Sequence, residues 1–475
     1  MKKYHDIGLR AVKGLNILLI TIPFALCWHL YYANYTAALF ARNARTYVVL
    51  LYIILYTIFG RVYDAFLVSY YRITEMIYNQ VLAFLVSDGL IYLVICLLCK
   101  KARSIVPGVF AIVGQAGLAT IWTLLVHRWY FRHFAAKRTV VVYDTREGME
   151  NLIHEYGLGK KFRIERIVRI EECLTNLSIL DGAEDVFLSG IHSHERNIII
   201  KYCTEHDITA MVIPRIGDVL MSSAKRMHLF HLPVLRVSRY NPKPEYLLAK
   251  RLFDVFISAT ALVILSPVML ITAFAIHATD KGPVFYRQTR LTKDRREFRI
   301  LKFRSMRVDA EKDGVARLST GDVDDRITPV GRFIRKVRID ELPQLINILK
   351  GDMTIVGPRP ERPEIAEEYE REMPEFKLRL QAKAGLTGYA QVYGKYNTTP
   401  YDKLMMDLMY IAHPGIAEDL RIIFATVKIL FLPESTEGIE AGQTTAMTQD
   451  IVGYDKVDTI YSDEEKNEKK TVQNS

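Results

Sequence analysis

The sequence predicts a membrane protein of mixed architecture: a four-helix transmembrane bundle, a small Rossmann-like α/β domain, and a second α/β domain that begins with a re-entrant membrane helix. Half of the 475 residues are hydrophobic, and the mean hydropathy is slightly positive, which is high for a purely soluble chain of this length. Long apolar runs lie before residue 135 and again after residue 250, while short β-rich runs alternate with helical stretches between them.

The first third of the chain is expected to be a membrane domain over residues 1–135. Its four apolar runs each reach the about 20 residues that a helix needs to cross about 30 Å of hydrocarbon. Basic residues flank the start of the first run and the end of the fourth, so the positive-inside rule favours both ends of this bundle inside. Pairing or snorkelling near an interface explains the charged residues Arg61, Asp64 and Asp88 better than a functional role does. The runs are Leu15–Tyr32, Tyr47–Val68, Ile77–Cys99 and Ile105–Tyr130.

Residues 139–240 are expected to form a degenerate Rossmann-like domain. The stretches TVVVYD, RIERIVRI, EDVFLSG and ITAMVIP are typical of strands, and helical stretches such as ERNIIIKYCTEHD separate them. This alternation predicts a small parallel α/β domain. A dinucleotide-binding domain would carry G-x-G-x-x-G after its first strand, but the chain reads YDTREGM there, so we predict no nucleotide cofactor. A regulatory or assembly role is expected instead.

A fifth apolar segment, Leu252–Ile276, is long enough to span a bilayer but carries two features that argue against a simple crossing. The first is Ser266-Pro267 at its middle, because proline removes a backbone donor and bends a helix. In lipid the carbonyl freed by the proline needs a partner, which the Ser266 hydroxyl can supply. The second is that both flanks are basic, which places both ends on one face of the membrane. We expect a re-entrant helix over residues 250–278, with a kinked ordinary span as the alternative.

An acidic pair, Asp340-Glu341, follows a run that is rich in arginine and lysine. Apolar residues recur at helical spacing from Leu342 onward, so Asp340 stands where the N-cap of a helix would stand. The helix N-terminus, together with Arg335 and Arg338, should then lower the pKa of Asp340. An ionised aspartate could attack phosphorus, and Glu341 beside it could hold Mg²⁺. The alternative is that Asp340 only caps the helix and Glu341 is a solvated acid.

Two neighbouring segments favour an anionic ligand for this region. The stretch GDMTIVGPRPERPE places Arg359 between two prolines on a stiff loop, and a held guanidinium suits phosphate. The basic run Val284–Arg307 has alternating apolar positions, so we expect strands with cationic side chains on one face. No RNA-binding module or helix-turn-helix pattern accompanies it, so nucleic acid is not an expected partner. The net charge of +10 instead suits lipid phosphate or a diphosphate substrate.

From about Lys250 to Leu432 the chain resembles the monotopic phosphoglycosyl transferases, bacterial sugar transferases that move a phosphosugar from a nucleotide to a polyprenyl phosphate. The shared motifs are KRLFD, the mid-membrane Ser-Pro, LKFRSM, RIDELPQL, GDMTIVGPRP, GLTGYAQVYG and DLMYI…EDLRII, which in this order are specific. The preceding bundle and α/β domain resemble the long form of the family, found in exopolysaccharide and capsule synthesis. The resemblance implies a catalytic α/β domain over residues 248–433. The polar stretch 434–475 is expected to be a disordered tail.

The resemblance also implies a two-step reaction that uses Mg²⁺. Asp340 would attack the sugar-bearing phosphorus of a UDP-sugar and release UMP, and undecaprenyl phosphate would then take the phosphosugar. Glu341 matches the metal-binding partner of the nucleophile. The other positions that the resemblance assigns are Arg335 and Lys302 as required cations, Arg304, Pro358, Arg359, Pro360 and Asp419 as substrate-binding residues, and Ser266 and Pro267 as the break of the membrane helix.

The chain departs from the family pattern at Ala384-Gly385, where many members read Pro-Gly, so the role of that loop in sugar selection does not carry over. Two alternatives to a transferase are a metal-dependent phosphatase or diphosphatase and a non-catalytic membrane scaffold. The donor sugar stays open, since glucose, galactose and their N-acetylated relatives all fit. The oligomeric state also stays open, although a homodimer is common for such architectures. The expected location is the bacterial cytoplasmic membrane, with the catalytic domain on its cytoplasmic face.

Overall fold

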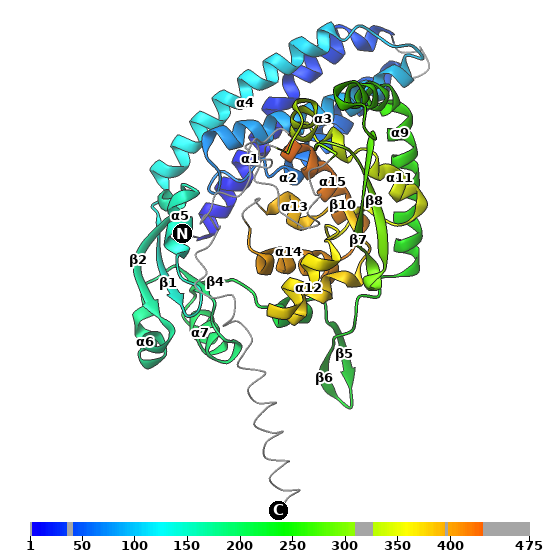
Figure 1. The fold of residues 1–475 in the computed structure, drawn as a ribbon. Helices are drawn as coiled ribbons and strands as arrows, with labels where there is room; N and C mark the ends of the chain where they lie inside the picture. The colour runs from blue at the N-terminus through cyan, green and yellow to red at the C-terminus, as the bar shows by residue number, and fades with distance from the viewer. Residues whose placement is uncertain (1, 36–40, 309–325, 395–397, 431–475) are drawn as a thin grey trace, which may run out of the picture. The chain divides into compact units, whose positions relative to one another are not determined.

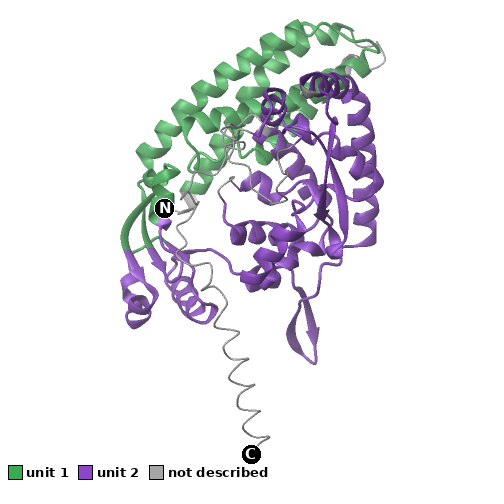
Figure 2. Cartoon of the chain, viewed as in Figure 1, with its two compact units in different colours: residues 1–140, 150–166, 182–185 green, residues 141–149, 167–181, 186–475 purple. Residues whose placement is uncertain are grey.

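The structure, a computed structural model, describes residues 2–35, 41–308, 326–394 and 398–430, so the predicted tail 434–475 lies outside the described residues. The chain forms two compact units (Figure 2). The first unit comprises residues 1–140, 150–166 and 182–185, and the second comprises residues 141–149, 167–181 and 186–475.

The first unit contains the predicted apolar helices (Figure 1). Within the described part of the chain, these helices and α9 of the second unit are the five that are long and apolar enough to cross a membrane. The predicted runs lie largely within them, although the first helix begins well before Leu15. The helices are α1 (Lys2–Leu30), α2 (Ala41–Val62), α3 (Ile73–Leu98) and α4 (Val106–His133).

Buried polar side chains connect these four helices. Asn16 of α1 donates to Gln80 of α3 at 2.9 Å, and Gln80 donates to Thr123 of α4 at 2.9 Å. The Tyr56 hydroxyl of α2 donates to Asn16 at 2.8 Å. Because lipid offers no competing partners, such interhelical hydrogen bonds help to hold apolar helices together. The four helices are therefore joined by specific polar contacts as well as by apolar packing.

The predicted strands of the middle region are confirmed. They are β1 (Lys137–Tyr143), β2 (Phe162–Arg169), β3 (Asp185–Ser189) and β4 (Thr209–Val212), in the sheet order β2-β1-β3-β4. The predicted helix is α7 (Ser193–Glu205). Order 2-1-3-4 is that of a doubly wound α/β sheet. The other elements of this region are α5 (Met149–Glu155), α6 (Ile170–Thr175), α8 (Ile216–Ser222) and the antiparallel pair β5 (Lys225–Leu229) and β6 (Leu232–Arg236).

Helix α9 (Pro244–Asp280) follows these elements in the second unit and contains Pro267. The backbone stays helical through the proline, and Figure 1 shows α9 changing direction along its length. Pro267 cannot donate to the carbonyl of Val263, four residues earlier, and the Ser266 hydroxyl donates to that carbonyl at 2.8 Å. The expected partner for the freed carbonyl is thus confirmed. The side chains of Ile271 and Phe274 are largely exposed, as a lipid-facing surface requires.

Much of the rest of this unit packs around a large apolar core. Leu404, Ile348, Met353 and Ile422 are fully buried in it. The strands form two pairs, the antiparallel β7 (Phe285–Leu291) and β8 (Glu297–Phe303), and the parallel β9 (Thr354–Val356) and β10 (Gly385–Thr387). The helices are α10 (Pro329–Lys336), α11 (Gln344–Lys350), α12 (Pro363–Glu372), α13 (Tyr389–Tyr393), α14 (Pro400–Ala412) and α15 (Ile416–Leu430).

The β7–β8 hairpin corrects the prediction that its cations share one face. The register pairs Tyr286 with Lys302 and Arg290 with Phe298. Because side chains alternate along a strand, Arg290 and Lys302 lie on one face while Arg287 and Arg299 lie on the other. Arg287 and Arg299 are exposed, whereas Arg290 and Lys302 make contacts at the site described below.

Candidate active site

The acidic pair lies in a single 3₁₀ turn (Ile339–Glu341) rather than at a helix cap. Arg338 precedes the turn in the left-handed conformation, with φ of 57°. Helix α11 starts only at Gln344, and Pro343 occupies its N-cap position. The expectation that Asp340 caps the helix is wrong, because the proline presets the backbone angle that starts a helix and leaves the acidic pair outside it.

The Asp340 carboxyl is buried, with 8% of the residue exposed. Within the described residues its Oδ1 atom has no hydrogen-bond partner. Burial and the neighbouring Glu341 raise the pKa of Asp340 to about 6, while Lys302, Arg335 and Arg338 oppose the rise. The predicted lowering of this pKa is therefore wrong, since desolvation and an adjacent like charge outweigh the cations. At neutral pH the carboxylate is ionised but poorly solvated, a state that suits a nucleophile.

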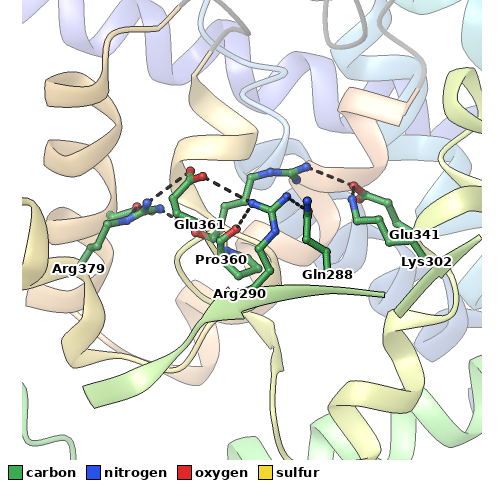
Figure 3. A network of polar contacts seen from close by, with 9 residues as sticks. Gln288, Arg290, Lys302, Glu341, Pro360, Glu361 and Arg379 are labelled. Carbon is green, nitrogen blue, oxygen red and sulfur yellow. Dashed lines mark hydrogen bonds and ion pairs between the residues drawn. The ribbon is translucent and has the colours of Figure 1, made fainter. Parts of the chain in front are cut away.

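Glu341 links two cations from separate elements (Figure 3). Its Oε1 atom lies 3.0 Å from Lys302 Nζ on β8 and 3.3 Å from Arg359 Nη2 on the loop after β9. Burial raises the pKa of Glu341, but Lys302, Arg359 and Arg338 together lower it below its ordinary value. Glu341 therefore stays ionised and fixes both cations beside Asp340.

The loop that carries Arg359 has little freedom. Pro358 and Pro360 fix two backbone angles, and the Pro358 carbonyl accepts from the Gly385 amide at 2.9 Å. A Cβ on Gly385 would lie 2.2 Å from the Gly357 nitrogen, so only glycine permits this approach of the two strands. This packing of β9 on β10 positions the loop that the sequence predicted to be stiff.

Two further arginines hold the same loop and were missed by sequence reasoning. Arg290 donates to the Pro360 carbonyl at 3.2 Å, and Arg379 donates to the Arg359 carbonyl at 2.9 Å (Figure 3). Arg290 could have been noticed in the basic run, but Arg379 lies in the stretch KLRLQ, which carries no motif. Both arginines donate to carbonyls of the loop, so they hold its backbone in place.

For three other residues predicted for the site, the interaction found with the acidic pair in the described structure is the charge effect of Arg335. Arg335 lies in the last turn of α10 and acts on Asp340 through its charge. Arg304 is buried, and its Nε atom donates to the Pro283 carbonyl at 2.7 Å. Asp419 lies in the first turn of α15 and accepts hydrogen bonds from Lys250 at 2.8 Å, Tyr246 at 2.9 Å and Tyr410 at 2.8 Å. The contacts found for Arg304 and Asp419 are thus to residues outside the acidic pair.

The KRLFD motif attaches α9 to the site. Arg251 donates to the carbonyls of Ile348 and Leu349 at 2.6 and 2.8 Å, near the C-terminus of α11. Asp254 accepts from the Thr354 hydroxyl at 2.7 Å and from the Ile355 amide at 3.0 Å, on β9. Helix α9 therefore contacts both the helix that follows the acidic pair and the strand that precedes the Arg359 loop.

The residues at the site fit a magnesium ion shared with a diphosphate ligand. No group of three or more histidine, cysteine, aspartate or glutamate side chains in the described part of the chain could hold a metal alone. Mg²⁺, however, commonly takes one or two carboxylates and completes its shell with phosphate oxygens and water. Asp340, with its unpartnered Oδ1, and Glu341 supply such a pair.

Comparison with known proteins gives the family. The profile of the bacterial sugar transferase family matches residues 245–433. The UDP-N-acetylgalactosamine-undecaprenyl-phosphate N-acetylgalactosaminephosphotransferase of Aeromonas hydrophila is 37% identical over 231 residues, which is 48% of this chain and 53% of that protein. The galactosyl transferase CpsE of Streptococcus agalactiae is 39% identical over 237 residues, or 48% of this chain and 51% of that protein.

A shorter relative is matched over most of its length. The UDP-glucose:undecaprenyl-phosphate glucose-1-phosphate transferase of Caulobacter vibrioides is 39% identical over 199 residues, which is 41% of this chain and 74% of that protein. The chain belongs to the bacterial sugar transferase family. It spans about half the length of the Aeromonas and Streptococcus relatives.

Proposed function

We propose that this protein transfers a sugar 1-phosphate from a UDP-sugar to undecaprenyl phosphate, giving undecaprenyl-diphosphate sugar and UMP. The observation that carries the proposal is the Asp340 carboxylate, whose buried Oδ1 atom has no hydrogen-bond partner within the described residues and whose charge interacts with those of Lys302, Arg335 and Arg338. Family membership and the relatives' names support the class of reaction.

In the first step, an Asp340 oxygen forms a bond to the sugar-bearing phosphorus of the donor. The bond from that phosphorus to the bridging oxygen breaks, and its electron pair leaves with UMP. In the second step, a phosphate oxygen of undecaprenyl phosphate attacks the same phosphorus, and the bond to Asp340 breaks. The carboxylate is restored, so each cycle is balanced without any further reactant.

The cations have a clear part in this chemistry. The diphosphate, the prenyl phosphate and the transition state are all anionic, and Lys302, Arg335 and Arg359 are held near the site where charge develops. Asp340 and Glu341 would hold Mg²⁺ together with the donor diphosphate. When bound, Mg²⁺ would neutralise phosphate charge and help to orient the donor.

The membrane setting supports a lipid-borne acceptor. Helix α9 exposes an apolar surface, and its KRLFD segment is bonded to α11 and β9. We propose that α9 enters and leaves the bilayer on the cytoplasmic face, where its basic flanks and UDP-sugars belong. The resulting lipid-linked sugar would begin exopolysaccharide or capsule synthesis.

The test is an assay of the purified full chain in lipid nanodiscs with a panel of UDP-sugars, because the relatives' names specify different sugars. We expect release of UMP that depends on Asp340 and formation of a prenyl-linked product. A phosphatase would release sugar phosphate without any prenyl acceptor. A non-catalytic scaffold would release no UMP, and Asp340→Ala would then leave cellular polysaccharide output unchanged.

A further inference from the structure

We propose that Arg379, held by Asp407, is a positioning residue that fixes the Arg359 loop against Glu341. The inference rests on the proposed transfer reaction, since Arg359 is one of its cations. Arg379 lies just before β10 and Asp407 lies on α14. Arg379 also contacts the loop, by a hydrogen bond to the Arg359 carbonyl and an ion pair with Glu361 (Figure 3).

The pair itself is almost completely buried. Arg379 is 4% exposed and Asp407 is 1% exposed. Two guanidinium nitrogens of Arg379, Nε and Nη2, lie 2.9 and 2.6 Å from Asp407 Oδ2. A buried ion pair contributes little net stability, because desolvation of both charges offsets their attraction. Net stability therefore does not explain this pair, and a contribution to a specific geometry is one role that buried ionic groups can have.

The remaining donors of Arg379 reach the loop. Nη2 donates to the Arg359 carbonyl at 2.9 Å, and Nη1 lies 3.5 Å from Glu361 Oε1. Arg290 binds the next carbonyl, that of Pro360 (3.2 Å), and lies 3.8 Å from Glu361. Because prolines lack an N–H, carbonyls are the main backbone groups by which this segment can be held. Two consecutive carbonyls of the loop, those of Arg359 and Pro360, are thus each held by a buried or half-buried arginine.

The Arg359 side chain is only partly enclosed, so the position of its backbone matters. The side chain is 42% exposed, and the contact with Glu341 is 3.3 Å. A long side chain on a mobile backbone would sample many positions, and its ordering would then cost binding free energy at each cycle. A displacement of about 1 Å in such a group can cost about 10²-fold in rate. Arg379 would prevent that displacement without touching the substrate.

The experiment compares Asp407→Asn with a matched control, Asp402→Asn, in the full chain. Asp402 also lies on α14 and binds a buried arginine, Arg146, through contacts of 2.8 and 3.0 Å, but it does not contact the loop in the described structure. We expect Asp407→Asn to lower kcat/KM for UMP release by about 10²-fold. Asp402→Asn should leave it within about twofold, with a comparable change in melting temperature.

A double-mutant cycle separates positioning from general damage. If Arg379 and Asp407 act through Arg359, Asp407→Asn should cause little further loss in an Arg359→Gln background. An undiminished loss in that background, or a loss matched by Asp402→Asn, would overturn the proposal. If Asp407→Asn does not fold, Arg379→Lys, which keeps the charge beside Asp407, is measured in the same cycle. An inactive wild-type chain would instead contradict the proposed function, so the two failures are distinguishable.

Discussion

Replacing Lys302 with glutamine should move the acid limb of the pH profile of kcat/KM to higher pH. The Asp340 pKa of about 6 already contains the lowering effect of Lys302. Removing that cation leaves burial and Glu341 as the main influences, and both raise the pKa. Since the nucleophile must be ionised, a higher pKa means that less of the enzyme is active at a given acidic pH.

The size of the effect follows from ordinary titration. With a pKa of about 6, about half of Asp340 is ionised at pH 6 and nearly all of it at pH 8. The wild-type ratio of kcat/KM between these two pH values should therefore be about two, and the rate at pH 5 should be about tenfold below the plateau. In Lys302→Gln the ratio between pH 8 and pH 6 should exceed two. The same substitution removes a charged partner of Glu341, so it should lower the free energy of unfolding by about 1.5–3 kcal/mol.

The assay is the initial rate of UMP release at low donor concentration, between about pH 5 and pH 9. Arg299→Gln is the control, because Arg299 is exposed on the opposite face of the same strand. It should preserve both the plateau and the acid limb. An acid limb in Lys302→Gln that stays in place or moves to lower pH would refute the electrostatic reasoning about Asp340.

Three other substitutions test the frame around the site. Asp254→Ala should lower the free energy of unfolding by about 3–5 kcal/mol, because two buried donors on β9 lose a charged acceptor, and thermal melting checks this. Gly331→Ala should also lower the melting temperature, by the equivalent of about 1–3 kcal/mol, since its Cβ would lie 1.9 Å from the Ser305 carbonyl oxygen. The control is Gly415→Ala, which should leave the melting temperature unchanged because its Cβ would meet open space. Pro267→Leu should straighten α9 so that it crosses the membrane completely, and cysteine labelling of its two ends checks this. If both ends are still labelled from the same side of the membrane and activity is kept, the proline does not have this role.

Local patterns predicted much of the fold. Uninterrupted apolar runs predicted α1 to α4, and alternating β-rich stretches predicted β1 to β4, because each pattern reflects the period of the element it forms. Proline chemistry alone predicted the bond from Ser266 to the carbonyl freed by Pro267. The wrong helix cap at Asp340 arose where two local signals competed, and Pro343 started the helix instead.

The burial and the supporting contacts of the site could not be predicted from local sequence patterns. The burial that raises the Asp340 pKa comes from packing between distant segments, so nearby arginines alone suggested the opposite direction. The bond from Arg379 to Asp407 spans 28 residues, and that from Ile355 to Asp254 spans 101. Contacts of this kind depend on the tertiary fold, which explains why motifs identified Asp340, Glu341 and Arg359 but not Arg290 and Arg379, which hold the Arg359 loop.

The most direct measurement is mass spectrometry of the full chain after incubation with a UDP-sugar in the absence of prenyl acceptor. We expect a phosphosugar adduct on Asp340 that appears with UMP, disappears when undecaprenyl phosphate is added, and is missing in Asp340→Asn. Prenyl-linked product formed while Asp340 stays unmodified, or by the Asp340→Asn variant, would contradict it.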